Sequence, residues 1–256
     1  MDGGTVVAKT SGLGDNLYIA GYNASGDIQQ LGSIGGGPAL LNMTGIDKSA
    51  YERQGGLRSG QIEFTAFHNH VAAGTGTHEI LAALPRTDVI LTYCRGTTLG
   101  DPAASLVAKQ VNYDGTRGDD GMLTFAVSAQ SNGYGIEWGR QLTAGLRTDT
   151  AATNGTSIDT AASASFGGQA YLHVTAFTGT DVTIKIQDSA DNSSFADVTS
   201  FAFTQVTAAP TSERIALGNT ATIRRYVRAI TTTTGGFSSV TFSVNLIKNE
   251  IAGVSF

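Results

Sequence analysis

The sequence predicts a mainly β protein built from two β-rich domains, with one short helix in the first. Apolar and polar residues alternate in run after run, as they do in strands that bury one face. Turn-forming Gly, Asp and Asn separate these runs at intervals of about ten residues. Only 14% of the 256 residues are charged, against about 25% in an average globular protein. Together these features favour sheets joined by tight turns.

In the first domain, residues 61–67 give the clearest strand pattern. Ile62, Phe64 and Ala66 form an apolar side, and the residues between them are polar. A strand with one side in water has this pattern. Further strands are expected at 88–95, 104–114, 121–131 and 133–142.

One helix of note is expected, beginning near Thr77, whose hydroxyl can cap the first turn. Leu81 and Leu84 provide its apolar stripe, and Pro85 ends it. We therefore expect a short helix on an otherwise β domain.

A polar segment separates the two domains. Residues 145–169 are rich in Thr, Ser, Ala and Gly, so they are not expected to bury enough surface to offset the entropy of ordering them. The predicted organisation is a first domain at 1–148, a linker at 149–167 and a C-terminal β-sandwich at 168–256. Strands of this sandwich are expected at 170–177, 181–189, 195–206, 213–218, 222–232 and 238–248.

Three of the four histidines, His68, His70 and His78, lie close together in the sequence, with Glu79 beside the last. One hypothesis is a metal-dependent hydrolase, since imidazoles and a carboxylate can bind Zn²⁺. The spacing does not fix their convergence, because a loop separates His70 from His78. We therefore predict ordinary polar residues, with no metal and no cofactor.

No pattern of catalytic residues is present in the sequence. The glycine-rich stretches 12–16 and 32–41 lack the Lys-Ser/Thr of a phosphate-binding loop, so we interpret them as turns. No G-x-S-x-G elbow occurs, and the single Cys94 falls within an expected strand. We predict that the protein is not an enzyme.

Charge and hydropathy argue against two classes of partner. The formal charge of −5 comes without a basic run, so specific nucleic-acid binding is not expected. No stretch approaches the roughly 18 apolar residues of a membrane span, and the start of the chain has no export signal pattern. We expect a soluble protein without a membrane partner.

The strand at 121–130 has two unequal faces. Leu123, Phe125, Val127 and Ala129 form a conventional core side. The opposite side is small and neutral, and Ala108, Gln110 and Asn112 repeat this character in the preceding strand. Its members are Thr124, Ala126, Ser128 and Gln130. A freely exposed sheet face usually carries Lys and Glu. This neutral side is either a lightly charged surface in contact with solvent or a smooth surface along which another molecule moves.

Two longer passages, 56–70 and 78–145, resemble the tail tube (major tail) proteins of long-tailed bacteriophages. The features that carry the resemblance are the strand around Phe64 and Phe67, the short helix before "LPRTD", the "NYD" at Asn112–Asp114 and the "EWG" at Glu137–Gly139. The resemblance covers roughly residues 40–145.

The resemblance implies a tail-tube-type β-sandwich or barrel whose copies join sheet edges into hexameric rings, which stack into a tube for DNA ejection. The channel lining would then comprise Glu63, Thr124, Ala126, Ser128 and Gln130. Genomic DNA would pass without specific binding, because a lining without Lys and Arg does not hold phosphates. Residues 1–148 carry 13 acidic and 10 basic side chains, a net charge of −3 that permits such a lining.

The resemblance also implies contacts with other tail components. The loop before the 61–67 strand would reach the adjacent ring through Asp47, Lys48, Tyr51, Glu52, Arg53 and Arg58. The alternative is a solvated loop without such contacts. Other implied partners are the tape measure, tail terminator and distal tail proteins, with assembly in the host cytoplasm into the virion. The C-terminal domain resembles immunoglobulin-like decorations of phage structural proteins. The alternative is a baseplate-associated or decoration protein whose C-terminal sandwich binds host-surface carbohydrate.

Overall fold

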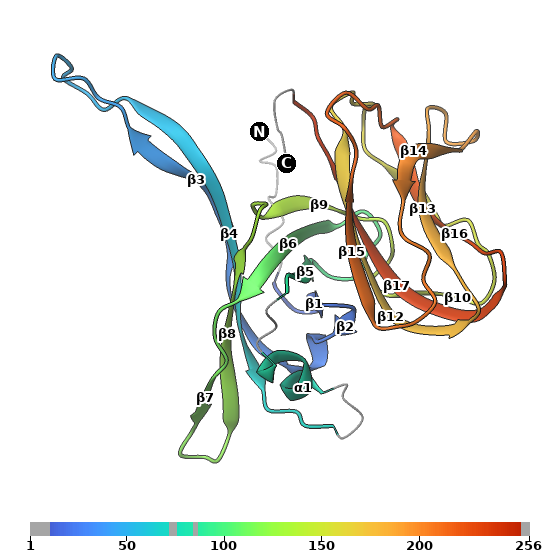
Figure 1. The fold of residues 1–256 in the computed structure, drawn as a ribbon, viewed down its shortest axis with the longest axis horizontal. Coiled ribbons are helices and arrows are strands. Elements are labelled where there is room, and N and C mark those ends of the chain that lie inside the picture. Colours follow the sequence, from blue (N-terminus) through green and yellow to red (C-terminus); the bar gives the residue numbers. More distant parts are fainter. Residues whose placement is uncertain (1–10, 72–75, 84–86, 252–256) are drawn as a thin grey trace, which may run out of the picture.

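The computed structural model describes residues 11–71, 76–83 and 87–251, and it is mainly β (Figure 1). Strands of the N-terminal part are β1 (Asn16–Ile19), β2 (Tyr22–Asn23), β3 (Ile28–Asn42), β4 (Arg53–Phe67), β5 (Val89–Cys94), β6 (Pro102–Gln110), β7 (Asp114–Arg117), β8 (Leu123–Ser131) and β9 (Glu137–Gln141). Its helices are the 3₁₀ turn η1 (Ser25–Asp27) and α1 (Thr77–Ala82). The C-terminal part contains β10 (Arg147–Asp149), β11 (Ile158–Asp159), β12 (Gly168–Gly179), β13 (Thr183–Ser189), β14 (Ala196–Ala202), β15 (Thr211–Ala216), β16 (Tyr226–Thr232) and β17 (Phe237–Lys248). The predicted mainly β class is confirmed.

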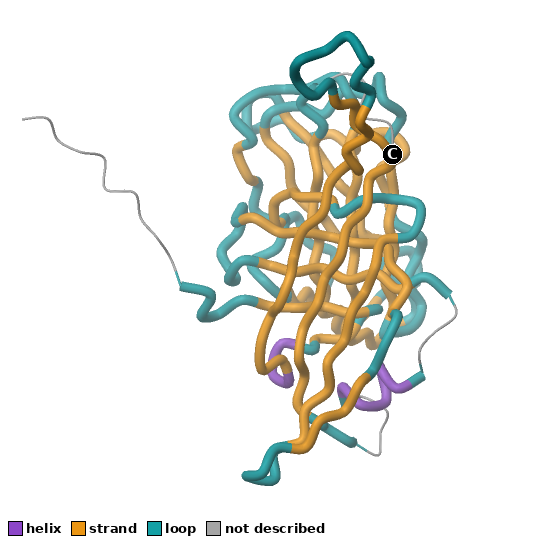
Figure 2. The backbone as a smooth tube through the Cα atoms, turned by 90° about the vertical axis from the view of Figure 1, so that its left-hand side faces the viewer, coloured by secondary structure: helices purple, strands orange, loops and turns teal. Residues whose placement is uncertain are grey.

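The N-terminal part consists of two sheets packed face to face. The front sheet has the order β3-β4-β8-β7, and the back sheet has the order β2-β1-β5-β6-β9. The long strands of the front sheet cross over those of the back sheet (Figure 2). The sheets are continuous at one corner, where β6 pairs with β8.

Alternation along the strands places one side of each sheet in the core between them. Ile62, Phe64 and Ala66 of β4 are buried there, as the sequence predicts. On β8, Val127 and Ala129 are buried, whereas Leu123 and Phe125 lie toward the end of the sheet and keep partial exposure. The core also takes side chains from the back sheet and α1, namely Leu17, Leu91, Leu106 and Leu81.

The helix α1 is present where the sequence predicts it, but its start differs from the prediction. Gly76 is the N-cap residue, and no side chain caps the helix. The Thr77 hydroxyl donates instead to Asp27 of η1, and this hydrogen bond links α1 to η1. Leu84 and Pro85 lie outside the described residues.

The prediction of a turn at residues 32–41 is wrong, because this glycine-rich stretch lies within the strand β3. Its backbone pairs with β4 along nearly its whole length. At Gly36, φ is +155°, and a Cβ there would collide with the carbonyl oxygen of Ser59. The glycine thus allows the close approach of two backbones. Three register shifts interrupt the pairing and bend the hairpin.

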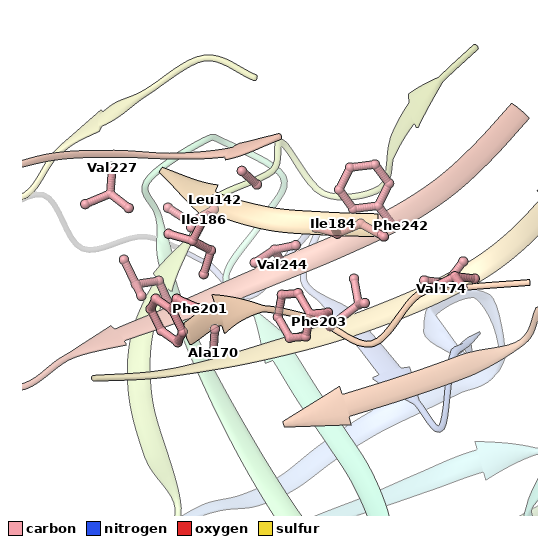
Figure 3. Packing of buried hydrophobic residues seen from close by; sticks show 14 of the residues in the cluster. Leu142, Ala170, Val174, Ile184, Ile186, Phe201, Phe203, Val227, Phe242 and Val244 are labelled. Carbon is pink, nitrogen blue, oxygen red and sulfur yellow. The ribbon is translucent and has the colours of Figure 1, made fainter. Parts of the chain in front are cut away.

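The C-terminal part is a second sandwich with its own core (Figure 3). The sheet β15-β12-β17-β10 packs on the sheet β11-β16-β13-β14. Phe201, Phe203 and Phe242 fill the space between the sheets together with aliphatic residues such as Ile184 and Val244. The six strands predicted for this half are all present.

Residues 149–167, for which the sequence predicts a polar linker, lie against the C-terminal sandwich. The segment contributes β11, which pairs with β16, and its Ile158 is buried in the sandwich core. Arg147 helps to hold it, donating to the carbonyl oxygens of Thr153 and Ala229. Backbone and side-chain hydrogen bonds thus order the segment despite its polar composition.

A buried polar network joins the two sandwiches. Arg214 of β15 donates from Nε and Nη2 to the two carboxylate oxygens of Glu137 of β9, at 3.1 and 3.0 Å. The Tyr171 hydroxyl of β12 donates to the same carboxylate, and the guanidinium lies 3.8 Å from the ring centroid of Tyr134. The side chains of Arg214 and Glu137 are 9% and 1% exposed, so each charge depends on the other for stabilisation.

A neutral histidine makes a second buried polar contact between the sandwiches. His173 of β12 accepts the amide proton of Gly21 at Nδ1, so Nε2 carries the proton and donates to Thr92 Oγ1 at 2.9 Å. The hydroxyl of Thr92 lies 2.9 Å from that of Ser105. Burial lowers the pKa of His173 to about 3. The histidine therefore holds the two sandwiches together in its uncharged form.

We expect Glu137→Gln to destabilise the fold strongly. The substitution leaves the Arg214 guanidinium buried without its counter-charge, which typically costs about 3–5 kcal/mol of unfolding free energy. Chemical denaturation checks this. Glu52→Gln is the control, since Glu52 forms an exposed pair with Lys48 at 3.6 Å that contributes about 1 kcal/mol or less. Equal losses in the two variants would contradict the role of the network.

We expect stability to fall as the pH drops below about 6.5, the ordinary pKa of histidine. Because the folded-state pKa of His173 is lowered to about 3, the unfolded chain takes up a proton that the folded chain does not. The contribution is complete above about pH 6.5 and declines by about 1.4 kcal/mol per pH unit toward pH 3.

The measurement is the unfolding free energy of the protein and of His173→Gln between pH 7 and pH 4. The variant keeps a donor and an acceptor but no titrating group, so its decline should be shallower by about one proton. Identical pH slopes would show that His173 does not make this contribution.

Candidate functional site

The candidate site is a set of surfaces on the front sheet. The first is the side of β4 and β8 that points away from the core, called here the neutral face. Register pairs Glu63 with Ser128, and Thr65 with Ala126. The predicted channel-lining residues thus lie side by side on one surface: Glu63, Thr124, Ala126, Ser128 and Gln130. Among the described residues, no element covers this surface, and α1 packs on the opposite side of the sheet (Figures 1 and 2).

Charge on the neutral face is sparse and mostly negative. Glu63 accepts a hydrogen bond from the Ser128 hydroxyl at 3.4 Å, and Asp114 of β7 lies opposite Ala126. Lys109 lies opposite Gln130 and forms an ion pair with Asp88 at 2.9 Å. The face therefore presents little that would hold a polyanion.

The expectation that Ala108 and Gln110 share the neutral character of this face is wrong. Ala108 is fully buried in the core. Gln110 lies opposite the buried Ala129 and donates to the Leu81 carbonyl oxygen at the end of α1. Asn112 does reach the β8 backbone, where it accepts the Ser128 amide proton at 2.7 Å. Period-2 alternation places the first two on the core side of β6.

The second surface is the outer edge of β3. Among the described residues this strand of 15 residues pairs only with β4, so its other row of backbone N–H and C=O groups faces outward. The strand contains no Asp, Glu, Lys or Arg. Charged side chains are a common device that keeps an edge strand from pairing with another chain. Such an edge is suited to intermolecular pairing.

The third surface is the arm, defined here as residues 39–58, where β3 and β4 extend beyond the body of the domain (Figure 1). Leu40 is 69% exposed and Leu57 is 90% exposed. Other large apolar side chains of the arm are also exposed, namely Leu41, Met43, Ile46 and Tyr51. Exposed apolar groups gathered on one projection are typical of an interaction surface.

All six residues predicted to make inter-ring contacts lie on the arm. Lys48 approaches Asp47 at 3.8 Å and Glu52 at 3.6 Å near the tip. The Arg53 guanidinium lies 5.1 Å from the ring centroid of Tyr51, and Arg53 and Arg58 belong to β4 rather than to a loop. The exposed apolar residues of the arm were not predicted, although "ALLNM" at 39–43 interrupts the polar pattern.

The three clustered histidines come together, which the sequence spacing did not predict. The rings of His68 and His78 lie 4.7 Å apart, and those of His70 and His78 lie 6.1 Å apart. His70 contacts Glu79, and His78 Nδ1 lies 2.9 Å from the Tyr113 hydroxyl. Within the described ranges, no three His, Cys, Asp or Glu side chains have an arrangement that could hold a metal ion. The three histidines therefore make aromatic and hydrogen-bonding contacts with one another and with their neighbours.

Two further features are a buried thiol and the lengths of the helices. Cys94 is buried at the end of β5, and burial raises the pKa of its thiol to about 12, which makes it a poor nucleophile. In the part of the chain that the structure describes, no helix has the length and apolar content needed to span a membrane.

Comparison with known proteins gives only distant likenesses. Neither a family model nor a curated protein matches the sequence. The Dit protein of SPP1, described as a hub of the adsorption apparatus in phages infecting Gram-positive bacteria, has a TM-score of 0.31 and 12% identity over 91% of this chain and 99% of its own. Two structures of the phage p2 baseplate in its activated conformation, with Sr and with Ca, have TM-scores of 0.33 and 0.30. Their identities are 9% and 11%, over 93% of this chain and 99% of theirs. TM-scores this low do not show a shared fold.

We expect the double substitution Ile46→Ser and Leu57→Ser to leave stability within about 0.5 kcal/mol, because both side chains are exposed. Self-association should fall, since these residues supply apolar surface on the arm. Thermal unfolding and sedimentation velocity measure the two effects. Leu13→Ser is the control, an exposed leucine outside the arm that should change neither quantity. Unchanged self-association of the arm variant would exclude the arm as a contact surface.

Proposed function

We propose that this chain is a non-enzymatic structural subunit of a bacteriophage tail that assembles into rings. The single observation that carries the proposal is the uncharged, unpaired outer edge of β3. At the other side of the front sheet, β7 pairs only with β8 among the described strands. Each copy thus offers two different edges, and edge-to-edge pairing of different surfaces closes into a ring when the rotation allows it.

In such a ring, the neutral face would line the central channel. Six copies, the number implied by the sequence resemblance, would join their front sheets into one inner barrel. Ala126, Ser128 and Gln130 would face the lumen, and DNA would pass over a surface without free cations. The C-terminal sandwich lies on the far side of the N-terminal part from this face (Figure 1) and would project outward.

The arm would contact the adjacent ring, so that rings stack into a tail tube. Its exposed leucines and Tyr51 supply the apolar area, while the charged residues near its tip supply orientation. The proposed partners are the tape measure protein in the channel and the tail terminator and distal tail proteins at the ends of the tube.

A second candidate is a baseplate-associated protein that binds host-surface carbohydrate. The observation that favours it is the half-exposed Trp138 in a hollow between the two sandwiches. A single ring rather than a stack would suffice for that role, so the two candidates differ in assembly.

Negative-stain electron microscopy of the purified protein at high concentration tests the proposal. Six-fold rings with a central channel are expected, in stacks for a tube subunit and singly for a baseplate subunit. Protein that stays strictly monomeric, together with virions in which labelled copies are absent from the tail, would overturn it.

We expect Ala126→Lys to create DNA affinity without preventing ring formation. The exposed alanine accepts a longer side chain, and each ring would carry one new cation per copy on the inner wall. DNA binding should appear in a filter or fluorescence assay and weaken steeply with salt. Thr199→Lys, on the exposed side of β14, is the control and should gain less affinity. Equal gains would place Ala126 outside the channel.

A further inference from the structure

A hollow lies at the seam between the two sandwiches. It has a volume of about 620 Å³ and is lined by the ends of β9 and β17 together with residues of the 158–160 segment. This volume falls in the range of about 300–1,000 Å³ that is usual for small-molecule sites. Trp138, the single tryptophan of the chain, forms part of its wall.

Trp138 is placed as an open aromatic platform. The side chain is 51% exposed, and its ring meets Tyr93 edge to face at a centroid distance of 6.4 Å. A second hollow of about 500 Å³ is lined by the same two rings with Arg95 and Asp101. The indole thus lies between two hollows. It contacts the ring of Tyr93, and no described residue covers it.

Polar groups of both signs border the platform. Arg140 follows Trp138 by two residues on β9, so both side chains lie on the same face of the strand, and both are exposed. Within the described chain, the side chains of Arg140 and Glu250 have no hydrogen bond or ion pair. Lys248 donates to Thr160 and to the Ala162 carbonyl oxygen. The free groups are therefore one guanidinium and one carboxylate.

Arg140, Lys248 and Glu250 all border this hollow. Burial lowers the pKa of Lys248, while the charge of Glu250 raises this pKa and the charge of Arg140 lowers it.

We infer that this seam hollow binds a neutral pyranose sugar. The apolar face of a pyranose ring can stack on the indole of Trp138, while Arg140 donates to ring hydroxyls and Glu250 accepts from them. A phosphate ligand fits less well, because the Glu250 carboxylate borders the hollow beside Arg140 and Lys248. A peptide strand has no open edge to join here, since β9 pairs with β6 on one side and with β17 on the other.

This inference deepens the second proposed function, the carbohydrate-binding baseplate protein, and does not depend on ring formation. It places the sugar between the two sandwiches rather than on the C-terminal sandwich alone. Trp138 and Arg140 belong to the N-terminal part, and Glu250 follows the last strand.

Tryptophan fluorescence of the full-length protein tests the inference, because all indole emission comes from Trp138. The probes are glucose, galactose, mannose and N-acetylglucosamine, each with a linear trisaccharide of the same unit. We expect a saturable change in emission with at least one probe. Arg140→Ala should weaken that binding at least tenfold without a change in melting temperature. Arg117→Ala is the control. Arg117 lies on β7 and does not border the hollow, so its substitution should leave binding unchanged.

Calorimetric titration of Trp138→Ala and Trp138→Phe separates the outcomes. Loss of binding in the alanine variant with partial retention in the phenylalanine variant supports the inference. Unchanged sugar binding in Trp138→Ala would overturn it and leave the baseplate alternative standing. No saturable response to any probe would overturn the inference and leave the baseplate alternative standing, because a sugar bound away from the indole would not change its emission. An emission change that depends only on protein concentration would mean that a second copy covers the indole, which also overturns the inference.

Discussion

Open strand edges are the constraint on which this architecture depends. A strand edge exposes backbone N–H and C=O groups that pair with any compatible chain. Within the molecule, β17 pairs with both β12 and β9, so the two sandwiches close edges for each other and share one continuous sheet. The edge of β3 has no such cover among the described strands, and its sequence offers no charge to protect it. In the proposed ring, another copy would pair with this edge.

The junction between the sandwiches uses a different kind of interaction. Glu137, Tyr171, His173 and Arg214 are polar side chains in a place where most interfaces would bury apolar ones. Each has a partner with good geometry, and the removal of one leaves another unsatisfied. The junction thus fixes one relative orientation of the two sandwiches.

Much of the fold could be predicted from the sequence, because β4, β8 and the strands of the C-terminal sandwich alternate regularly between apolar and polar residues. The neutral face followed from the same period-2 pattern. β3 could not be predicted in this way, since its glycines and Pro38 hide the alternation, and its pairing with β4 is visible only in three dimensions. The meeting of His68 with His78 depends on Asp27, which binds Asn69 and Thr77 from a distant part of the chain.

The exposed apolar surface of the arm and the position of Trp138 were missed for a related reason. Whether Leu57 or Trp138 is buried depends on what packs above it, and local sequence does not record that. Alternation assigns a side chain to one face of a strand, but it does not say whether that face meets another element.

The arm and the β7–β8 hairpin extend from opposite ends of the front sheet (Figure 1). The arm carries the exposed Leu40, Ile46 and Leu57 together with charges of both signs, whereas the hairpin carries Asp114, Asp119 and Asp120. Any stack built by repeating this subunit is therefore polar, with two chemically distinct termini. In the proposed stack, different proteins would then meet the two termini, and the asymmetry of a single copy would set its direction.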